Sequence, residues 1–286
     1  MTVALGLLAA ACYGTSDFLG GLMSRRAGGA FGVVLGGRVA ALTLLAVLAP
    51  VVTEAAPVAE ELGWGGLAGA GGAGGVLLLY RGMMLGKMSV VAPVSAIGAS
   101  ALPVLVGLAL GDRPSLLAAA GILLGLTAIA VVSAPPDQRF GPEVVLRELR
   151  PGGATLYGLG AGTGFALVFV SLDQAGGHGD LWPVLAAQAS SLVLVAVGAA
   201  TARRSVRVPL RLLPGVALLG ALSATAMTSF LLASRTGLLA LVAVLAALYP
   251  AVTVLLARVV VGERLAALQR VGVAVAIVGV LLIAIG

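Results

Sequence analysis

One carboxylate stands inside an apolar stretch near the start of the chain. Asp17 lies in CYGTSDFLGG (12–21), directly after the apolar run VALGLLAAA (3–11). It precedes Arg25 by about 12 Å if the segment is helical, at about 1.5 Å per residue. A charge inside a membrane helix is costly and usually faces a cavity that carries an ion or a substrate. Tyr13 shares a helical face with Asp17, and Ser16 adjoins it. This group could bind substrate or exchange a proton; alternatively, Asp17 is tied to an arginine.

A lone base follows in the next apolar run, 31–52. Arg38 could recognise an anionic group such as a substrate carboxylate. It could instead snorkel toward the membrane surface or form a permanent ion pair with Asp17, since a lone acid and base in neighbouring spans tend to pair. The two interpretations are linked, because an Arg38 that holds Asp17 ionised makes proton exchange there less favourable.

Further polar residues and prolines are scattered through the apolar runs. A polar residue in a span more often bonds a neighbouring helix than a ligand, but as a set some of them are expected to line a path. Proline frees a backbone carbonyl and lets a helix bend. The candidate polar residues are Ser95, Ser100, Tyr157, Thr163, Gln188, Thr228 and Tyr249, and the candidate bend positions are Pro93, Pro103 and Pro250.

Other chemistries lack the residues they need. The segment GAGGAG (69–74) fits a dinucleotide fingerprint, but neither a strand before it nor an acid about 20 residues after it supports that reading. Its glycines are better explained by close helix packing. His178 is the single histidine, in a glycine-rich turn, and no phosphate-binding loop, zinc motif or Cys/His cluster occurs. We therefore expect no catalytic residue, no cofactor and no metal.

The composition places the elements that carry these residues in a bilayer. Of 286 residues, 60% are hydrophobic and 10% charged, and the mean hydropathy is +1.15. A soluble domain has about 25% charged residues. The chain is therefore expected to be an all-α polytopic membrane protein, whose first apolar run is retained as a span. Its single cysteine, Cys12, excludes a disulfide within the chain.

Breaks at charges, prolines and glycine clusters predict ten spans of about 20 residues. They are 3–23, 31–52, 63–84, 88–110, 115–133, 153–172, 181–200, 211–233, 237–260 and 265–285. The longest polar gap, APPDQRFGPEVVLRELRP (134–151), predicts a linker with one short turn near 143–150. Residues 1–133 and 152–286 then form two five-helix units.

The two units match weakly but in order. Gly14-Thr15 corresponds to Gly162-Thr163, Arg38 to Gln188, and Pro103 to Pro250, while GDRPS (111–115) corresponds to GERLA (262–266). Because each unit has five spans, the second must enter the membrane in the opposite sense. The sequence thus predicts an inverted repeat, a common plan of secondary transporters with a substrate site near the midplane.

Charge predicts the orientation. Loops after even-numbered spans carry only Arg113 and Arg235, and the opposite side takes the remaining loop cations, which are Arg25, Arg26, Arg81, Lys87, Arg139, Arg147, Arg150, Arg203, Arg204, Arg207, Arg211, Arg258 and Arg264. The positive-inside rule places the cation-rich side in the cytoplasm and both termini outside. This distribution accounts for the net charge of +6, so no nucleic-acid partner is expected.

The second unit resembles a known family. The segment 234–284 has a Gly opening its first span, Pro250 late in that span, a Gly-Glu-Arg turn (262–264), Gln269 and Gly279-Val280. This pattern is similar to the second repeat of EamA-type members of the drug/metabolite transporter superfamily. The resemblance implies ten helices in two inverted repeats, a central cavity, and export or exchange of small metabolites, amino acids or drugs. Many members have cytoplasmic termini, which differs from the orientation that charge predicts here.

These observations predict a multi-pass secondary transporter of the inner (plasma) membrane, an exporter that works by alternating access and is coupled to protons through Asp17. The partners expected are lipid, a small-molecule substrate and protons, for a monomer or a homodimer. The alternatives are an uncoupled facilitator or exchanger and a lipid-carrier flippase. An intramembrane enzyme and a structural membrane subunit fit the sequence less well.

Overall fold

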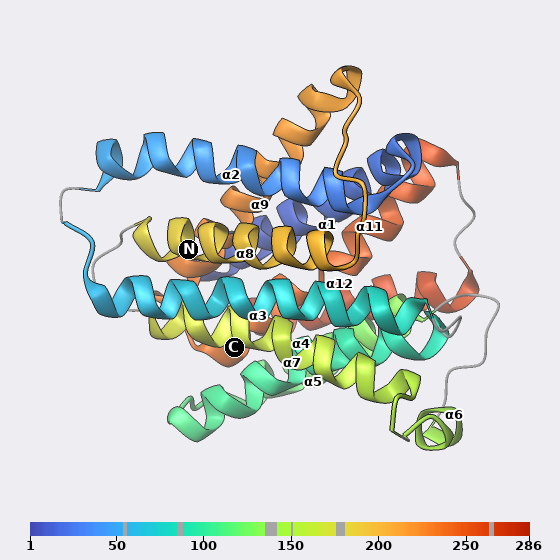
Figure 1. Cartoon of the computed structure of the whole chain (residues 1–286). Helices are drawn as coiled ribbons and strands as arrows, with labels where there is room; N and C mark the ends of the chain where they lie inside the picture. The colour runs from blue at the N-terminus through green and yellow to red at the C-terminus, as the bar shows by residue number, and fades with distance from the viewer. Residues whose placement is uncertain (54–55, 85–87, 135–141, 150, 176–180, 263–265) are drawn as a thin grey trace.

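The computed structural model describes the chain except residues 54–55, 85–87, 135–141, 150, 176–180 and 263–265. The ordered elements of the described part are helices (Figure 1). They are α1 (Thr2–Ala27), α2 (Ala30–Val52), α3 (Ala59–Met83), α4 (Met88–Leu110), α5 (Leu116–Ser133), α6 (Pro142–Arg147), α7 (Ala154–Gln174), α8 (Trp182–Thr201), η1 (Leu210–Leu212), α9 (Leu213–Ser234), α10 (Leu239–Ala247), α11 (Tyr249–Leu256), η2 (Ala257–Val261) and α12 (Ala267–Ile285).

Ten helices of the described chain are long and apolar enough to cross a membrane, which confirms the predicted spans. The linker carries the short helix α6, close to the predicted turn. His178, Glu263 and Arg264 lie outside the described residues.

The three prolines behave differently. The ninth span is divided at Leu248 into α10 and α11, with Pro250 in the first turn of α11. Proline has no N–H to donate and clashes with the carbonyl four residues earlier, which explains an interruption at this point. In contrast, α4 runs without interruption through Pro93 and Pro103.

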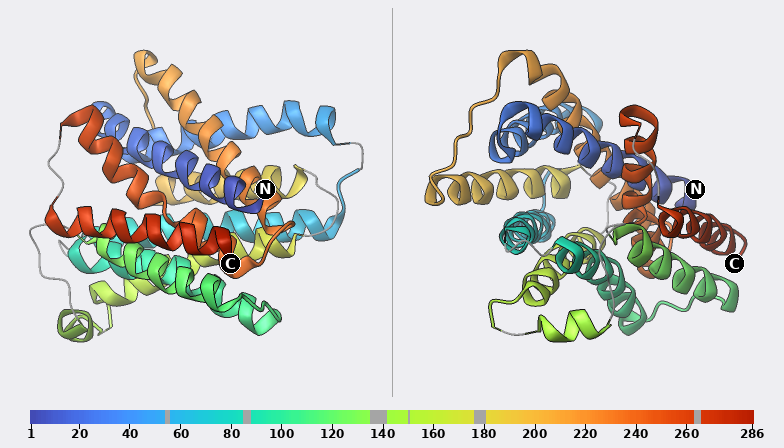
Figure 2. Two further views of the ribbon diagram at one scale, coloured as in Figure 1. Left: turned by 180° about the vertical axis from the view of Figure 1, so that it is seen from behind. Right: turned by 90° about the vertical axis from the view of Figure 1, so that its right-hand side faces the viewer.

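Small residues bring the helices together. Helix α3 packs on α7 and α8, α4 packs on α7, α1 packs on α9, and α5 lies beside α12 along one edge of the molecule (Figure 2). A Cβ atom added to Gly121 of α5 would collide with the carbonyl of Gly279 in α12. The glycine spacing therefore serves close helix packing, as small residues do in membrane bundles.

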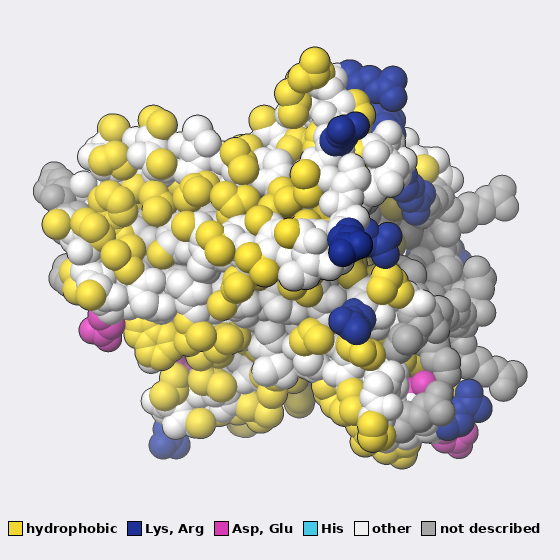
Figure 3. All heavy atoms as spheres, viewed as in Figure 1, with side chains coloured by type: hydrophobic (Ala, Val, Ile, Leu, Met, Phe, Trp, Pro, Cys, Tyr) yellow, Lys and Arg dark blue, Asp and Glu magenta, His cyan; other side chains and the backbone are white. Residues whose placement is uncertain are grey.

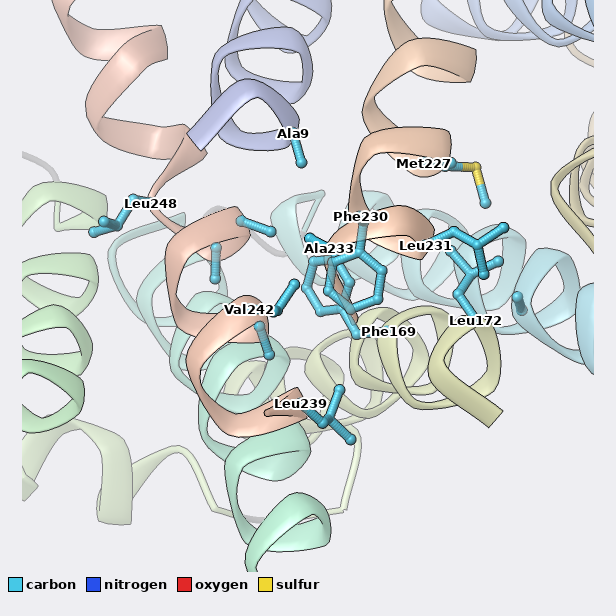
Figure 4. Packing of buried hydrophobic residues seen from close by; sticks show 14 of the residues in the cluster. Ala9, Phe169, Leu172, Met227, Phe230, Leu231, Ala233, Leu239, Val242 and Leu248 are labelled. Carbon is cyan, nitrogen blue, oxygen red and sulfur yellow. The ribbon is translucent and has the colours of Figure 1, made fainter. Parts of the chain in front are cut away.

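The half-helix α10 lies in the centre of the protein. Eight of its nine residues are buried. Val242 and Leu239 of α10 face Phe169 of α7 and Phe230 of α9 in one apolar cluster (Figure 4). The carboxylate of Asp112, in the loop between α4 and α5, accepts a hydrogen bond from the backbone N–H of Ala240 at 2.9 Å. It caps the start of α10, where a helix has unpaired N–H groups and favours negative charge.

Charge divides the two ends of the bundle. Arginine side chains gather at one end, on the right in Figure 3, which we call the Arg-rich end. It includes Arg25 and Arg26 at the end of α1, Arg81 at the end of α3, and Arg211 in η1. The chain starts at the other end, where the Thr2 hydroxyl donates to the carbonyl of Thr236 at 3.0 Å.

Candidate functional site

Asp17 is exposed on the side of α1 that faces the protein. Ala10, seven residues earlier, shares the face of Asp17 and is 2% exposed. Leu8 lies two and a half turns before Asp17, on the opposite face, and is 43% exposed. The lipid-facing side of α1 is therefore the Leu8 side. Asp17 and Gly21, one turn further on, are both exposed on the inner side. We call this exposed inner face, from Asp17 to Gly21, the Asp17 opening.

Helices from both units of the chain border this opening. Asp17 lies within electrostatic range of Arg38 of α2, Tyr80 of α3 and Tyr249 of α11, as well as of Tyr13 one turn before it. An exposed carboxylate on the inner face of α1, within electrostatic range of side chains from three other helices, faces the region between them. From Asp17, α1 continues to Arg25 and Arg26 at the Arg-rich end, and on the way a Cβ atom added to Gly21 would meet nothing within 4 Å.

Arg38 is held from the side by two helices of the second unit. Its Nη1 donates to Oε1 of Gln188 in α8 at 2.8 Å and to Oγ of Ser223 in α9 at 3.3 Å. Gln188 is fully buried, and its Nε2 lies 3.4 Å from both the Ser223 hydroxyl and the Met227 sulfur. The buried amide thus fixes the position of the guanidinium, and its own donors are also engaged.

Asp17 and Arg38 do not form an ion pair. Their nearest charged atoms lie more than 4.0 Å apart, and the carboxylate of Asp17 has no hydrogen bond with any residue that the structure describes. The permanent pair considered from the sequence is therefore not formed in this conformation. Arginine has five N–H donors, of which Gln188 and Ser223 take two. Those on Nε and Nη2 have no partner in the described chain and are not sealed from solvent.

Tyr13 closes the inner end of the opening. Its ring lies edge-on to Phe169 of α7 and to Tyr249 of α11, with centroid distances of 6.3 Å in both cases. Phe169 stacks on Phe230 of α9 at 4.6 Å. The hydroxyl of Tyr13 is buried and has no hydrogen-bond partner among the described residues. Four helices thus supply the aromatic rings that separate the opening from the other end of the bundle.

Two hydroxyl groups fix α1 beside the opening. Ser16 donates to the carbonyl of Leu219 in α9 at 3.3 Å, and Thr253 of α11 donates to the carbonyl of Gly14 at 3.0 Å. A Cβ atom on Gly14 would collide with the carbonyl of Tyr249. Ser16 therefore positions Asp17 through its helix, and its own hydroxyl is occupied.

The other predicted residues lie apart from Asp17 or bond locally. The hydroxyls of Ser95 and Ser100 donate to carbonyls of their own helix, α4. Tyr157 packs against the last turn of α3, at Gly82. Thr163 shares an exposed stripe of α7 with Leu156 and Leu159, which faces lipid. Thr228 is half-buried, and its side chain forms no hydrogen bond within the described chain.

Sequence reasoning missed two residues of the site. Ser223 supports Arg38, and Tyr80 lies within the electrostatic reach of Asp17 and Arg38. Ser223 sits in a span with three other hydroxyl residues, Thr225, Thr228 and Ser229, and no pattern in the sequence separates them. Tyr80 could have been noted as an aromatic hydroxyl next to Arg81 at a helix end.

A second hollow lies at the Arg-rich end. It has a volume of about 440 Å³ and is lined by Arg26, Arg211 and Leu212. Asp17 and Arg38 do not line it, so it is distinct from the Asp17 opening.

Comparison with known proteins identifies the fold. No protein-family model and no curated protein sequence matches the chain. Fifteen chains of known structure match, including one described as a crystal structure of a protein, with a TM-score of 0.74 and 18% sequence identity. That alignment covers 98% of this chain and 95% of the other. At this identity the likeness concerns the fold alone, over nearly the full length of both chains.

Proposed function

We propose that this protein is a secondary transporter of the EamA type that moves a small molecule by alternating access, with the Asp17 opening as its entrance from the cytoplasm. The observation that carries the proposal is the exposure of Asp17 on the inner face of α1, one turn from Tyr13, whose hydroxyl is buried. A path that enters from one end and stops at mid-span is what alternating access requires of each end state. The positive-inside rule favours the Arg-rich end as the cytoplasmic one, in an inner membrane.

The helix contacts support an inverted repeat. By their order in the chain, α1, α2, α3 and α5 of the first unit correspond to α7, α8, α9 and α12 of the second. Replacing each helix by its counterpart turns the pair α3–α7 into α9–α1 and the pair α3–α8 into α9–α2. All four of these pairs are in contact. The pairs α5–α12 and α2–α8 map onto themselves and also occur. Arg38 and Gln188, which correspond in the alignment of the two units, meet in a hydrogen bond. Such contacts between equivalent residues are expected at a pseudo-two-fold axis.

The packing at the other end also favours this function over a purely structural role. Tyr13, Phe169 and Phe230 seal the centre beyond Asp17. A structural subunit would have no reason to keep an acid and a base within the spans without pairing them, because each charge is costly there. Proton coupling through Asp17 remains a prediction. It requires that Asp17→Asn abolish uphill transport driven by a pH gradient in liposomes.

Alternating access can be tested with two single-cysteine variants in a Cys12→Ala background. Gly21→Cys reports on the opening, since a Cβ there meets nothing within 4 Å. Leu239→Cys reports on the sealed end, since Leu239 is 3% exposed at the start of α10. A membrane-impermeant thiol reagent should label Gly21→Cys from the cytoplasm and Leu239→Cys from outside, and a change of pH or ligand should shift the two reactivities in opposite directions. Simultaneous labelling from both sides would indicate a channel, and persistent protection of both would exclude transport through this path.

A further inference from the structure

Two opposite charges face the same opening without neutralising each other. Asp17 lacks a hydrogen bond within the described chain, and Arg38 keeps its Nε and Nη2 donors free of described partners. Each charge acts on the other, yet no ion pair forms. An unpaired charge at this depth is costly, so the arrangement favours a ligand that compensates both charges at once.

The support around Arg38 keeps the two charges apart. Gln188 and Ser223 both accept from Nη1, on the side of the guanidinium away from its Nε–Nη2 edge. That edge carries two parallel N–H groups, which is the geometry that binds a carboxylate in a bidentate manner. A buried glutamine that does not titrate is suited to this task, because it orients the arginine without cancelling its charge.

We propose, on the basis of the transport function proposed above, that the substrate is a zwitterion of the amino-acid kind, with its ammonium group on Asp17 and its carboxylate on the Nε–Nη2 edge of Arg38. The hydroxyl of Ser223 accepts from Arg38 and from Gln188, so its own proton is available to a carboxylate placed beside Arg38. Both charged groups belong to the first unit of the chain, on the adjacent helices α1 and α2.

Binding to the purified protein in nanodiscs tests the two contacts separately. The probes are the twenty standard amino acids, followed by two analogues of the best binder, an amine that lacks its carboxylate and an acid that lacks its ammonium group. The zwitterion should bind more tightly than either analogue, by about 10- to 100-fold, as expected for the loss of one charged hydrogen-bonded contact.

The variants should separate the two ends of the ligand. Asp17→Asn should weaken binding of the zwitterion and of the amine while leaving binding of the acid unchanged. Arg38→Gln should weaken binding of the zwitterion and of the acid while leaving binding of the amine unchanged. Asp173→Asn, which alters an acid in α7 that already accepts from Gln174, should change none of them and serves as the control. Arg38→Lys and Asp17→Glu keep the charge and provide a second pair of variants if the neutral ones do not fold. Thermal unfolding shows which of the variants are folded.

Two results would overturn the inference. One is an amine that binds as tightly as its zwitterion and is indifferent to Arg38→Gln; the other is a folded protein that binds none of the amino acids. Transport of the same probes in liposomes distinguishes the two proposals. If the amine is transported and the zwitterion is not, the proposed transport function is supported and the proposed zwitterion site is contradicted. If a zwitterion binds, and the variants change its binding as predicted, but it never crosses the membrane, the proposed site is supported and the proposed transport function is contradicted.

Discussion

The two units of the chain differ most where α1 and α7 face the centre. Gly14 and Gly162 correspond in sequence, and each packs closely on a helix of the other unit, on α11 and on α4 respectively. Beyond these glycines, α1 continues with Asp17 and Gly21, both exposed. At the corresponding positions α7 carries Phe165 and Phe169. The ring of Phe165 lies against Gly75 of α3, and Phe169 is 5% exposed.

The same contrast holds one helix further on. The first unit has Arg38 where the second has Gln188, and the two side chains meet. The first unit thus supplies the charges, the opening and Tyr13, while the second supplies the other three aromatic rings of the closure and a neutral support. This difference teaches that side-chain size and charge decide which face of the centre is filled, even where the two units carry corresponding glycines.

Filling the opening should have the largest effect. Gly21→Phe gives α1 the residue that α7 has at the corresponding position, and a Cβ atom at Gly21 meets nothing within 4 Å. We expect transport to be abolished while the protein remains folded. Uptake into liposomes and thermal unfolding measure the two properties. Gly63→Phe in α3, where the glycine is also exposed but lies away from the opening, is the matched control. Equal transport activity of the two variants would contradict the difference described between α1 and α7.

Removing the neutral support should have the next largest effect. Gln188→Leu deletes the acceptor that holds Nη1 of Arg38, so we expect the guanidinium to move toward Asp17 and pair with it. Binding of the amino-acid probe should weaken by about tenfold, the scale of one charged contact. Gln188→Glu retains an acceptor for Arg38 and should retain the position of the guanidinium. Unchanged binding in Gln188→Leu would show that Arg38 needs no support from the second unit.

The contact between Asp112 and α10 should contribute to stability. Asp112→Ala removes a cap that the first unit provides to the central half-helix of the second. The expected loss is about 1 kcal/mol, as for other N-terminal caps. Thermal unfolding in detergent measures it, with Asp112→Asn as the variant that keeps an acceptor. If neither variant unfolds at a lower temperature than the unchanged protein, the cap contributes no free energy of unfolding.

Tyr13 should give the smallest effect on stability. Its buried hydroxyl has no partner in the described chain, so Tyr13→Phe removes an unpaired polar group and leaves the ring contacts with Phe169 and Tyr249 intact. The melting temperature should stay the same or rise slightly, because an unsatisfied buried group is unfavourable. A clear fall in melting temperature would reveal a hydrogen bond of the hydroxyl in the folded protein and would change the description of the closed end.

The sequence predicted the spans well because the bilayer imposes their length and composition. It also singled out Asp17, Arg38 and Gln188, since charged or amide groups are conspicuous among apolar residues. It could not show that Arg38 bonds Gln188 instead of Asp17, because this choice depends on the positions of helices far apart in the chain. For the same reason it did not distinguish Ser223, which faces the site, from Ser100, which bonds its own helix.

Cysteine accessibility at two corresponding positions tests the central claim most directly. In the Cys12→Ala background, Asp17→Cys should react readily with a membrane-impermeant thiol reagent applied at the Arg-rich end. Phe165→Cys should be protected, because that position in α7 is packed against α3. Equal labelling of the two cysteines, or protection of Asp17→Cys from the reagent, would contradict an opening that reaches mid-span from one end alone.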